Sequence, residues 1–337
     1  MFSQSFHLKY KFMKKTFIGI DVSMASLDVF VKNDLSTESF VIENTAKAIA
    51  RFFKQYDYES TYVAMENTGR YNWSIYEALA SFKGHVYVVS PLHLKKSMGL
   101  VRGKNDKIDA IRIASFIEKN YSNTAQWKPL PLAIKKIKIL LSERNLRISQ
   151  KKQLDQQLSS YQLIKSTGLD KTLIKLNQQM VRGLKSQIEA LEKELQDIIK
   201  SDEILSAQAQ LVGSIPGVGK VLTWMLLSAT EGFKKINEPR KFACYCGVVP
   251  FEHQSGTSIR GKTRVSSFAD KKLKSILHMA AMRAIQLKND LQEYYHRKVK
   301  EGKNKMSVLN AVRNKIIHRV FAVIKNQTPY QMNLVLS

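Results

Sequence analysis

The first part of the chain alternates short β-type runs with helical patterns. Residues 14–21, 26–32 and 38–42 are rich in β-branched and aromatic side chains and are separated by polar breaks, which predicts three neighbouring strands. Helical patterns over 45–56 and 72–82 then alternate with strand patterns over 61–65 and 85–89. Strands that alternate with helices after an initial meander predict an α/β domain with a mixed sheet covered by helices.

The middle of the chain carries a long helical pattern. Residues 132–200 are rich in Lys, Gln and Glu, and apolar side chains recur every three or four positions from Leu173 to Ile198. With an earlier helix over 137–163, broken near Gly168, this heptad-like seam predicts an antiparallel helical hairpin or a dimerising arm. A helix that packs only against its own domain is the alternative.

A glycine-containing turn opens the C-terminal region, which is mainly helical. The segment SIPGVG over 214–219, followed by an apolar helix over 221–229, has the form of a helix-hairpin-helix. In that motif glycine lets backbone amides approach a DNA phosphate, and the next helix N-terminus adds a favourable dipole. We therefore expect Gly217, Gly219 and Lys220 to contact nucleic acid, with a purely structural turn as the alternative.

The charge of the chain indicates the kind of partner. Fifty-four Lys and Arg residues stand against 28 Asp and Glu, and the net charge of +26 is spread along most of the sequence. Such an excess favours a polyanionic partner, of which nucleic acid is the most common. The sequence has no apolar run of about 18 residues and no signal-peptide pattern. We expect a soluble cytoplasmic protein without a membrane partner.

Carboxylates interrupt the apolar patterns at three places. Asp21 ends the first strand, Glu66 ends the strand over 61–65, and Asp106 and Asp109 stand three residues apart on one face of a predicted helix. Four such groups could hold two Mg²⁺ or Mn²⁺ ions, which stabilise the attacking and leaving oxygens of a phosphoryl transfer. Taken singly, Asp21 could be a turn residue and Asp106 a helix N-cap.

Basic residues lie beside the acidic residues and also in a second segment that is a candidate site. Those beside the third acidic group are expected to hold a phosphate backbone; they are Arg102, Lys104 and Lys107. A second basic segment, 252–264, is interpreted as a glycine-containing loop. Its Ser255 could attack a phosphate, although a serine that only hydrogen-bonds the phosphate is the more common case. Three cations could stabilise the developing charge; they are Arg260, Lys262 and Arg264.

These motifs together resemble a known family. GIDVS around Asp21, AMENTG around Glu66 and KNDKIDA around Asp106 and Asp109 are similar, in order and spacing, to the N-terminal motifs of the DEDD transposases of the insertion-sequence one-ten family, relatives of the Piv DNA invertases. IPGVG, YCGVVP and the SG…RG…S run resemble the C-terminal transposase domain of that family. The resemblance extends over residues 14–287.

The resemblance implies a domain plan. It places an RNase H-like (RuvC-like) catalytic domain at 14–130, a coiled-coil linker and oligomerisation arm at 131–203, and a C-terminal transposase domain with the serine loop at 204–290. An N-terminal extension, 1–13, and a basic helical tail, 291–337, complete the expected plan.

The resemblance also implies a reaction. A serine attacks DNA and forms a covalent link while the carboxylates hold magnesium, and Ser255 matches that position, with Ser258 as the nearby competitor. A structured bridge RNA would guide recognition of donor and target DNA by a dimer or tetramer at the bacterial nucleoid. A RuvC-type nuclease in which water attacks, and a non-catalytic nucleic-acid-binding scaffold, are the alternative hypotheses.

Overall fold

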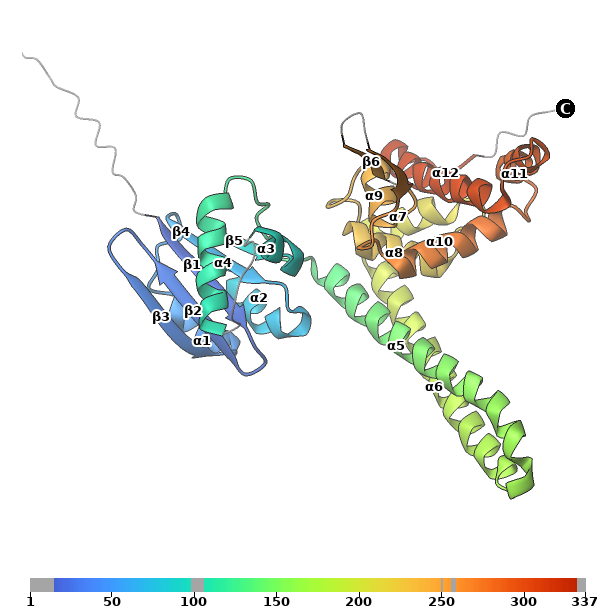
Figure 1. The fold of residues 1–337 in the computed structure, drawn as a ribbon, viewed down its shortest axis with the longest axis horizontal. Coiled ribbons are helices and arrows are strands. Elements are labelled where there is room, and N and C mark those ends of the chain that lie inside the picture. The colour runs from blue at the N-terminus through green and yellow to red at the C-terminus, as the bar shows by residue number, and fades with distance from the viewer. Residues whose placement is uncertain (1–14, 98–105, 250, 256–258, 332–337) are drawn as a thin grey trace, which may run out of the picture. The chain divides into compact units, whose positions relative to one another are not determined.

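The protein folds as two compact units. The computed structural model describes residues 15–97, 106–249, 251–255 and 259–331, without the side chains of residues 162, 251–255 and 259–264. Unit 1 comprises Met1–Pro129 and unit 2 comprises Leu130–Ser337 (Figure 1). The two units are described separately below.

Unit 1 is built on a five-stranded mixed sheet with the strand order β3-β2-β1-β4-β5. The first three strands form an antiparallel meander, and β4 runs parallel to both β1 and β5. The predicted α/β class is confirmed, and this topology is compatible with an RNase H-like domain. The strands are β1 (Thr16–Val22), β2 (Ser26–Lys32), β3 (Thr37–Glu43), β4 (Thr61–Glu66) and β5 (His85–Val89).

Helices cover both faces of this sheet. Alternate residues of each strand point to opposite faces, and the two faces bury two separate apolar clusters. One face packs against α1 (Ala46–Phe53) and α2 (Trp73–Leu79), which follows the short helix η1 (Gly69–Asn72). The other face packs against α3 (Pro91–Ser97) and α4 (Asp106–Asn120).

Unit 2 begins with a long helical hairpin that extends from the other helices of the unit (Figure 1). It consists of α5 (Leu132–Ser160), the short helix η2 (Tyr161–Thr167) and α6 (Asp170–Ser201). Arg144 of α5 forms an ion pair with Glu192 of α6 at 2.6 Å. Along the outer part of the hairpin, Leu176 and Met180 are more than half exposed. The sequence predicted this helical hairpin, whereas its use as a coiled-coil arm remains a prediction.

The rest of unit 2 is a helical domain with one small hairpin. Its elements are α7 (Glu203–Gly213), α8 (Lys220–Thr230), α9 (Pro239–Tyr245), β6 (Phe251–Ser255), β7 (Ile259–Arg264), α10 (Lys271–Ala284), α11 (Asp290–Lys300) and α12 (Lys305–Asn326).

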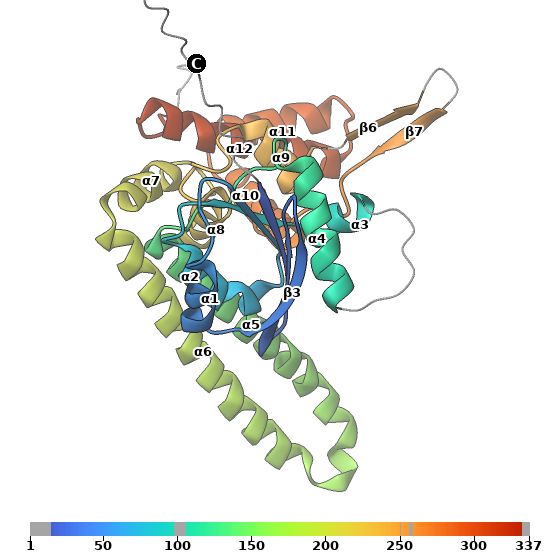
Figure 2. The same ribbon diagram turned by 90° about the vertical axis from the view of Figure 1, so that its left-hand side faces the viewer.

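Two segments differ from the interpretation of the sequence. The segment read as a basic loop forms the antiparallel hairpin β6–β7, which projects from the helices of unit 2 (Figure 2). The segment read as a basic tail contains α12, which places Val312, Ile316 and Val320 in the main core with no exposed surface. The expected helix is present, and its apolar face packs into the core while Lys305, Lys315 and Lys325 are exposed.

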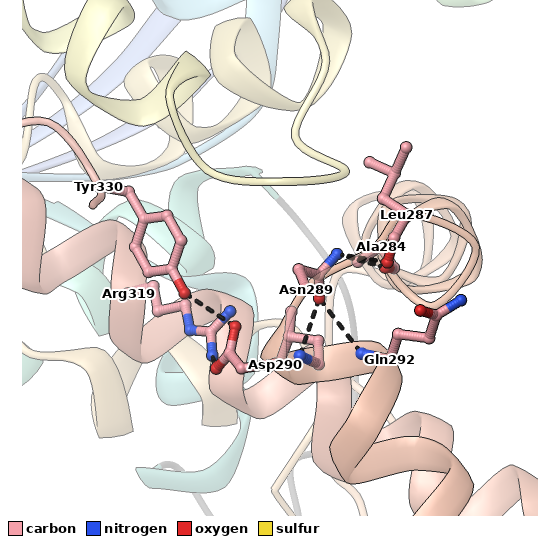
Figure 3. A network of polar contacts seen from close by, with 8 residues as sticks. Ala284, Leu287, Asn289, Asp290, Gln292, Arg319 and Tyr330 are labelled. Atoms are coloured by element: carbon pink, nitrogen blue, oxygen red, sulfur yellow. Dashed lines mark hydrogen bonds and ion pairs between the residues drawn. The ribbon is translucent and has the colours of Figure 1, made fainter. Parts of the chain in front are cut away.

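The C-terminal helices are held by a polar network around Asn289, whose side chain is buried (Figure 3). Its Nδ2 donates to the carbonyl oxygens of Ala284 and Leu287, at 2.8 and 2.9 Å, while its Oδ1 accepts from two amides at the start of α11. The neighbouring Asp290 forms an ion pair with Arg319 of α12 and accepts a hydrogen bond from the Tyr330 hydroxyl at 2.9 Å. The Asn289 side chain thereby provides hydrogen-bond partners for carbonyl oxygens at the end of α10 and for amides at the beginning of α11.

Among the described residues, none of the helices combines the length and the apolar character needed to span a membrane.

Candidate active site

The acidic residues of unit 1 lie on the face of the sheet that α4 covers. On β1, Ile18 and Ile20 belong to the opposite core, so Asp21 shares its face with Phe17, which packs in the α4-side cluster. The same alternation on β4 puts Glu66 on the face of Ala64, another member of that cluster. Because β1 and β4 are parallel neighbours, both carboxylates come to one edge of the sheet.

A close approach of α4 to β1 brings the third acidic group to the same edge. A Cβ atom on Gly19 would lie 2.1 Å from the Ala110 carbonyl oxygen and 2.4 Å from the Ala114 amide nitrogen. Only glycine at this strand position and alanine at these helix positions permit such packing. Asp106 and Asp109 form the first turn of α4, where the helix dipole favours negative charge. No pattern in the sequence indicates this contact.

The four predicted acids influence one another electrostatically. Burial and the charges of Asp106, Asp109 and Glu66 together raise the pKa of Asp21 to about 6, although a hydrogen bond from the Val22 amide acts in the opposite direction. Like charges that share a partly buried site oppose each other's ionisation. The structure therefore brings together the four carboxylates that the sequence had selected from three separate segments.

Glu66 is held by a turn that the sequence did not reveal as part of the site. Asn72 is fully buried, and its Nδ2 donates to the Glu66 carbonyl oxygen at 2.9 Å. Its Oδ1 accepts from the backbone amide and the hydroxyl of Thr68, at 2.7 and 2.8 Å. The backbone after β4 is thereby fixed, and with it the direction in which Glu66 leaves the strand. An Asn six residues after the glutamate was the only sequence signal.

A fifth carboxylate, Asp28 of β2, stands directly opposite Asp21 in the antiparallel register. Burial and the charge of Asp106 raise the pKa of Asp28, while Lys107 lowers it. Sequence reasoning overlooked Asp28 because it sits inside a strand pattern and not at its end. Counting residue pairs outward from the β1–β2 turn would have found it, since cross-strand partners share a face.

The oxygen donors suit a hard divalent cation by their chemistry. Carboxylates are preferred ligands of Mg²⁺, and the mutual repulsion that raises the pKa of Asp21 is what a cation would relieve. Asp109 also accepts from Arg112 at 2.7 Å, so part of its charge is already paired. Over the residues that the structure describes, no three His, Cys, Asp or Glu side chains are arranged to ligate one ion. The donor set fits a metal, although its members are not in ligating positions.

The predicted basic residues around this site are only partly described. Lys107 is exposed in the first turn of α4, close enough to lower the pKa of Asp28. Arg102 and Lys104 lie outside the described residues.

In unit 2, the glycine turn between α7 and α8 has a clear structural role. Gly217 has a φ of +85°, and a Cβ atom on it would lie 2.4 Å from the Ala280 carbonyl oxygen of α10. Gly219 is the N-cap residue of α8, and a Cβ there would meet no atom within 4 Å. Gly219 and Lys220 are exposed. The turn thus packs through Gly217 and leaves the α8 N-terminus accessible, and the nucleic-acid contacts of Gly217, Gly219 and Lys220 remain a prediction.

The candidate serine lies at the end of a strand. Ser255 is the last residue of β6, and its backbone pairs with that of Ile259 at the start of β7. The three predicted cations, Arg260, Lys262 and Arg264, follow along β7. The competing Ser258 lies outside the described residues.

Comparisons with known proteins agree with these motifs. Residues 209–296 match a family model described as the Transposase IS116/IS110/IS902 family, and residues 18–163 match a second model, described as a transposase, of the DEDD type in the IS110 group. The chain is 26% identical to the pilin gene-inverting protein of Moraxella bovis, and the alignment covers 96% of this chain and 99% of that protein.

Two further relatives have similar levels of identity. The pilin gene-inverting protein of Moraxella lacunata is 25% identical, with 96% of this chain and 99% of that protein covered. A putative transposase of Sinorhizobium fredii (strain NBRC 101917 / NGR234) is 24% identical, with 80% of this chain and 72% of that protein covered.

Proposed function

Because the chain belongs to the IS110 family of transposases, we propose that it is a site-specific DNA recombinase that cuts and rejoins phosphodiester backbones at the ends of a mobile or invertible element. Its relatives, named pilin gene-inverting proteins and a putative transposase, support the action on DNA. The observation that carries the proposal is the grouping of Asp106, Asp109 and Glu66 around Asp21, since burial and the charges of these three carboxylates raise the pKa of Asp21 to about 6.

The acidic set supplies the electrostatic part of the reaction. Asp21, Glu66, Asp106 and Asp109 would hold Mg²⁺ or Mn²⁺, which when bound stabilises charge on the attacking and leaving oxygens. The rigid parts of unit 1 present these acids: the Gly19 contact fixes α4 on β1, and the buried Asn72 fixes the turn after Glu66. Lys107, with Arg102 and Lys104 of the same segment, would bind the phosphate backbone.

Ser255 supplies the nucleophile. Its hydroxyl oxygen attacks the phosphorus of a DNA phosphodiester, the bond from phosphorus to one sugar oxygen breaks, and that sugar leaves as a hydroxyl after gaining a proton. A hydroxyl of the incoming strand then attacks the same phosphorus and releases the serine with its proton restored. The number of phosphodiester bonds is conserved, so the reaction needs no external energy source. Arg260, Lys262 and Arg264 would stabilise the charge on the phosphorus oxygens.

Partners follow from the family and the charge. We propose that donor and target DNA are selected through a structured bridge RNA, since the net charge of +26 favours several polyanionic partners. We also propose that the α5–α6 hairpin joins copies of the chain into a dimer or tetramer. Exposed Leu176 and Met180 on that hairpin support a contact between copies.

The direct test is recombination between two plasmids that carry the element junction and its target, with the native flanking RNA supplied. Asp21→Asn, Glu66→Gln, Asp106→Asn and Asp109→Asn are each expected to abolish product. The matched control is Asp34→Asn, which removes an exposed carboxylate from the turn between β2 and β3. Recombination by the four acid variants at the level of Asp34→Asn would refute an acidic active site.

The serine is tested by its covalent product. A denaturing gel should show labelled DNA attached to the wild-type protein and not to Ser255→Ala, while Ser267→Ala, an exposed serine just beyond β7, keeps the adduct. Cleavage that persists in Ser255→Ala without an adduct would support the alternative, a RuvC-type nuclease in which water attacks. Loss of the adduct in Ser258→Ala alone would move the nucleophile to that residue.

A further inference from the structure

A basic cavity lies in unit 2 at the foot of the hairpin that carries Ser255. It is a shallow cavity, widely open to solvent, with a volume of about 1000 Å³, and it is formed by α10, α12 and the two residues that flank the hairpin, Val248 and Val265. Its polar lining comes from Lys271, Lys274, Ser275 and His278 of α10 and from Ser307, Asn310 and Arg313 of α12. No carboxylate belongs to this lining in the part of the chain that the structure describes. The cavity is therefore a concentrated positive site.

Arg313 is the central observation. The residue is only 6% exposed, and its Nε has no hydrogen-bond partner among the described residues. A buried guanidinium without a counter-charge is costly, and burial accordingly lowers the pKa of Arg313. Native proteins nearly always satisfy such groups, with a partner in the chain or with a ligand. Among the side chains that the structure describes, none that lines the cavity is acidic, so an anion that enters the cavity would supply a counter-charge for Arg313.

The other lining groups have the geometry of an anion site. The His278 Nδ1 is buried and also lacks a hydrogen-bond partner in the described structure. Lys274 is half-buried and lies along the Gly247 backbone, where a Cβ on that glycine would sit 3.9 Å from the lysine Nζ. Asn310 donates to the Val248 carbonyl oxygen at 2.8 Å and so fixes α12 to the segment that enters the hairpin. Two residues that each carry an unsatisfied buried nitrogen, Arg313 and His278, and the half-buried Lys274 thus line one cavity.

We propose that this cavity, through Arg313, Lys274 and His278, binds a phosphodiester of the DNA strand on which Ser255 acts. The proposal rests on the proposed function, which provides the DNA strand, and it assigns to that strand an anchor away from the reacting phosphate. A planar guanidinium suits a phosphate because it can donate two parallel hydrogen bonds to its oxygens.

The length of the hairpin sets the position of the anchored phosphate. β6 runs from Phe251 at its foot to Ser255 at its end, and four strand steps span roughly 14 Å. Phosphates of one strand of duplex DNA advance by about 3.4 Å along the helix axis. The anchored phosphate should therefore lie about four nucleotides from the phosphate that is cut.

The test measures DNA binding without catalysis, in the Ser255→Ala background. Arg313→Met and Lys274→Met are compared with Lys272→Met, which removes an exposed lysine of α10 that does not line the cavity. The probe is a fluorescein-labelled 30-base-pair duplex that contains the element junction, and anisotropy is recorded at several salt concentrations. Each cavity variant should lower the slope of log K against log salt by about 1, whereas Lys272→Met should not.

A phosphate scan locates the contact. Neutral methylphosphonates are placed one at a time within six nucleotides of the cut. A methylphosphonate at one of these positions should weaken DNA binding by the protein with an intact cavity. The same methylphosphonate should not weaken DNA binding by Arg313→Met any further, because the two changes remove the same contact. A scan in which no position couples to Arg313 or Lys274 would overturn the proposal, as would coupling that appears only with an RNA duplex of the same sequence.

Two controls separate the possible failures. Arg313→Met should retain its thermal stability without DNA, since it replaces an unpaired buried charge with an apolar side chain, and a marked loss of stability would instead assign Arg313 a structural role. Lys274→Met keeps the proposal testable in that event. The scan needs no covalent adduct, so an absent adduct counts against the serine chemistry, while an absent coupling counts against the cavity.

Discussion

Replacing Asp21 should stabilise the metal-free protein while it abolishes the reaction. In the folded state burial and the neighbouring carboxylates raise the pKa of Asp21 from 3.8 to about 6. Each pKa unit corresponds to about 1.4 kcal/mol of difference between the two protonation states. At pH 7 the shift costs the folded state about 3 kcal/mol as an upper value, and partial solvation of this half-buried group reduces that to about 1–2 kcal/mol.

The sign follows from proton counting. Between pH 3.8 and about 6 the folded state binds more protons at Asp21 than the unfolded state does, so this group lowers stability as the pH rises through that range. Above the folded pKa the full penalty is present, and near pH 4 it falls to about half a kcal/mol or less. Asp21→Asn removes the charge and retains a side-chain oxygen that can accept from the Val22 amide. Its gain in stability should therefore be largest at pH 7–8 and disappear toward pH 4.

Amide hydrogen exchange in EDTA measures this effect within unit 1. Peptides from β1 and β4 of Asp21→Asn should exchange about five- to thirty-fold more slowly than those of the wild type at pH 7, and within about two-fold of the wild-type rates at pH 4. Asp34→Asn, which removes an exposed carboxylate from the same unit, should leave both rates unchanged. Faster exchange in Asp21→Asn at pH 7, or a gain that does not depend on pH, would refute the argument that repulsion and burial act on Asp21.

Four further changes test how the fold positions its parts. Gly19→Ala should destabilise unit 1 by about 3 kcal/mol or more and reduce recombination, since its Cβ would lie 2.1 Å from the Ala110 carbonyl oxygen. A melting temperature of this variant equal to that of the wild type would contradict the prediction. Gly183→Ala, a helical glycine with open space around it, should instead stabilise unit 2 by about 0.5–1 kcal/mol. Asn72→Ala should cost about 2 kcal/mol and lower the recombination rate through Glu66; a normal rate in refolded, stable protein would exclude a positioning role. Asn289→Ala leaves the amides at the start of α11 without their cap and should cost about 2 kcal/mol in urea unfolding, and a change below 0.5 kcal/mol would contradict this.

The acidic residues could be selected from the sequence because their pattern is local. A carboxylate at the end of an apolar strand is visible in one segment, and the order of Asp21, Glu66 and Asp106 needed no knowledge of packing. Asp28 and Asn72 were missed because their importance depends on partners: the first on the register of β1 and β2, the second on three hydrogen bonds that close a turn. Long-range register and buried polar contacts leave no periodic signal along the chain.

Charge was a poor guide to structure in unit 2. The three cations of β7 led to the interpretation of a loop, and the basic residues of the C-terminal segment led to the interpretation of a helical tail, although α12 has only five Lys and Arg among its 22 residues. In α12 the apolar positions Val312, Ile316 and Val320 recur at helical spacing and are fully buried, so periodicity was the better guide there. In β6–β7 the strands are short and polar on both faces, and neither periodicity nor composition distinguishes such a hairpin from a loop.

The two units share one physical feature, a buried or half-buried charge that the described part of the chain does not compensate. In unit 1 the charge is negative: Asp21 and its neighbours repel one another. In unit 2 it is positive: Arg313 is buried with an unpartnered Nε and no acid among the residues lining its cavity. Such charges destabilise the folded protein, and a bound ligand of opposite charge can offset this cost. A ligand that binds only the folded state adds RT ln(1 + [L]/Kd) to the free energy of unfolding. Millimolar Mg²⁺ should therefore protect β1 and β4 from exchange and leave α10 and α12 unaffected, while duplex DNA protects α10 and α12. Protection of α10 and α12 by Mg²⁺ alone would contradict the assignment of the two charges to different ligands.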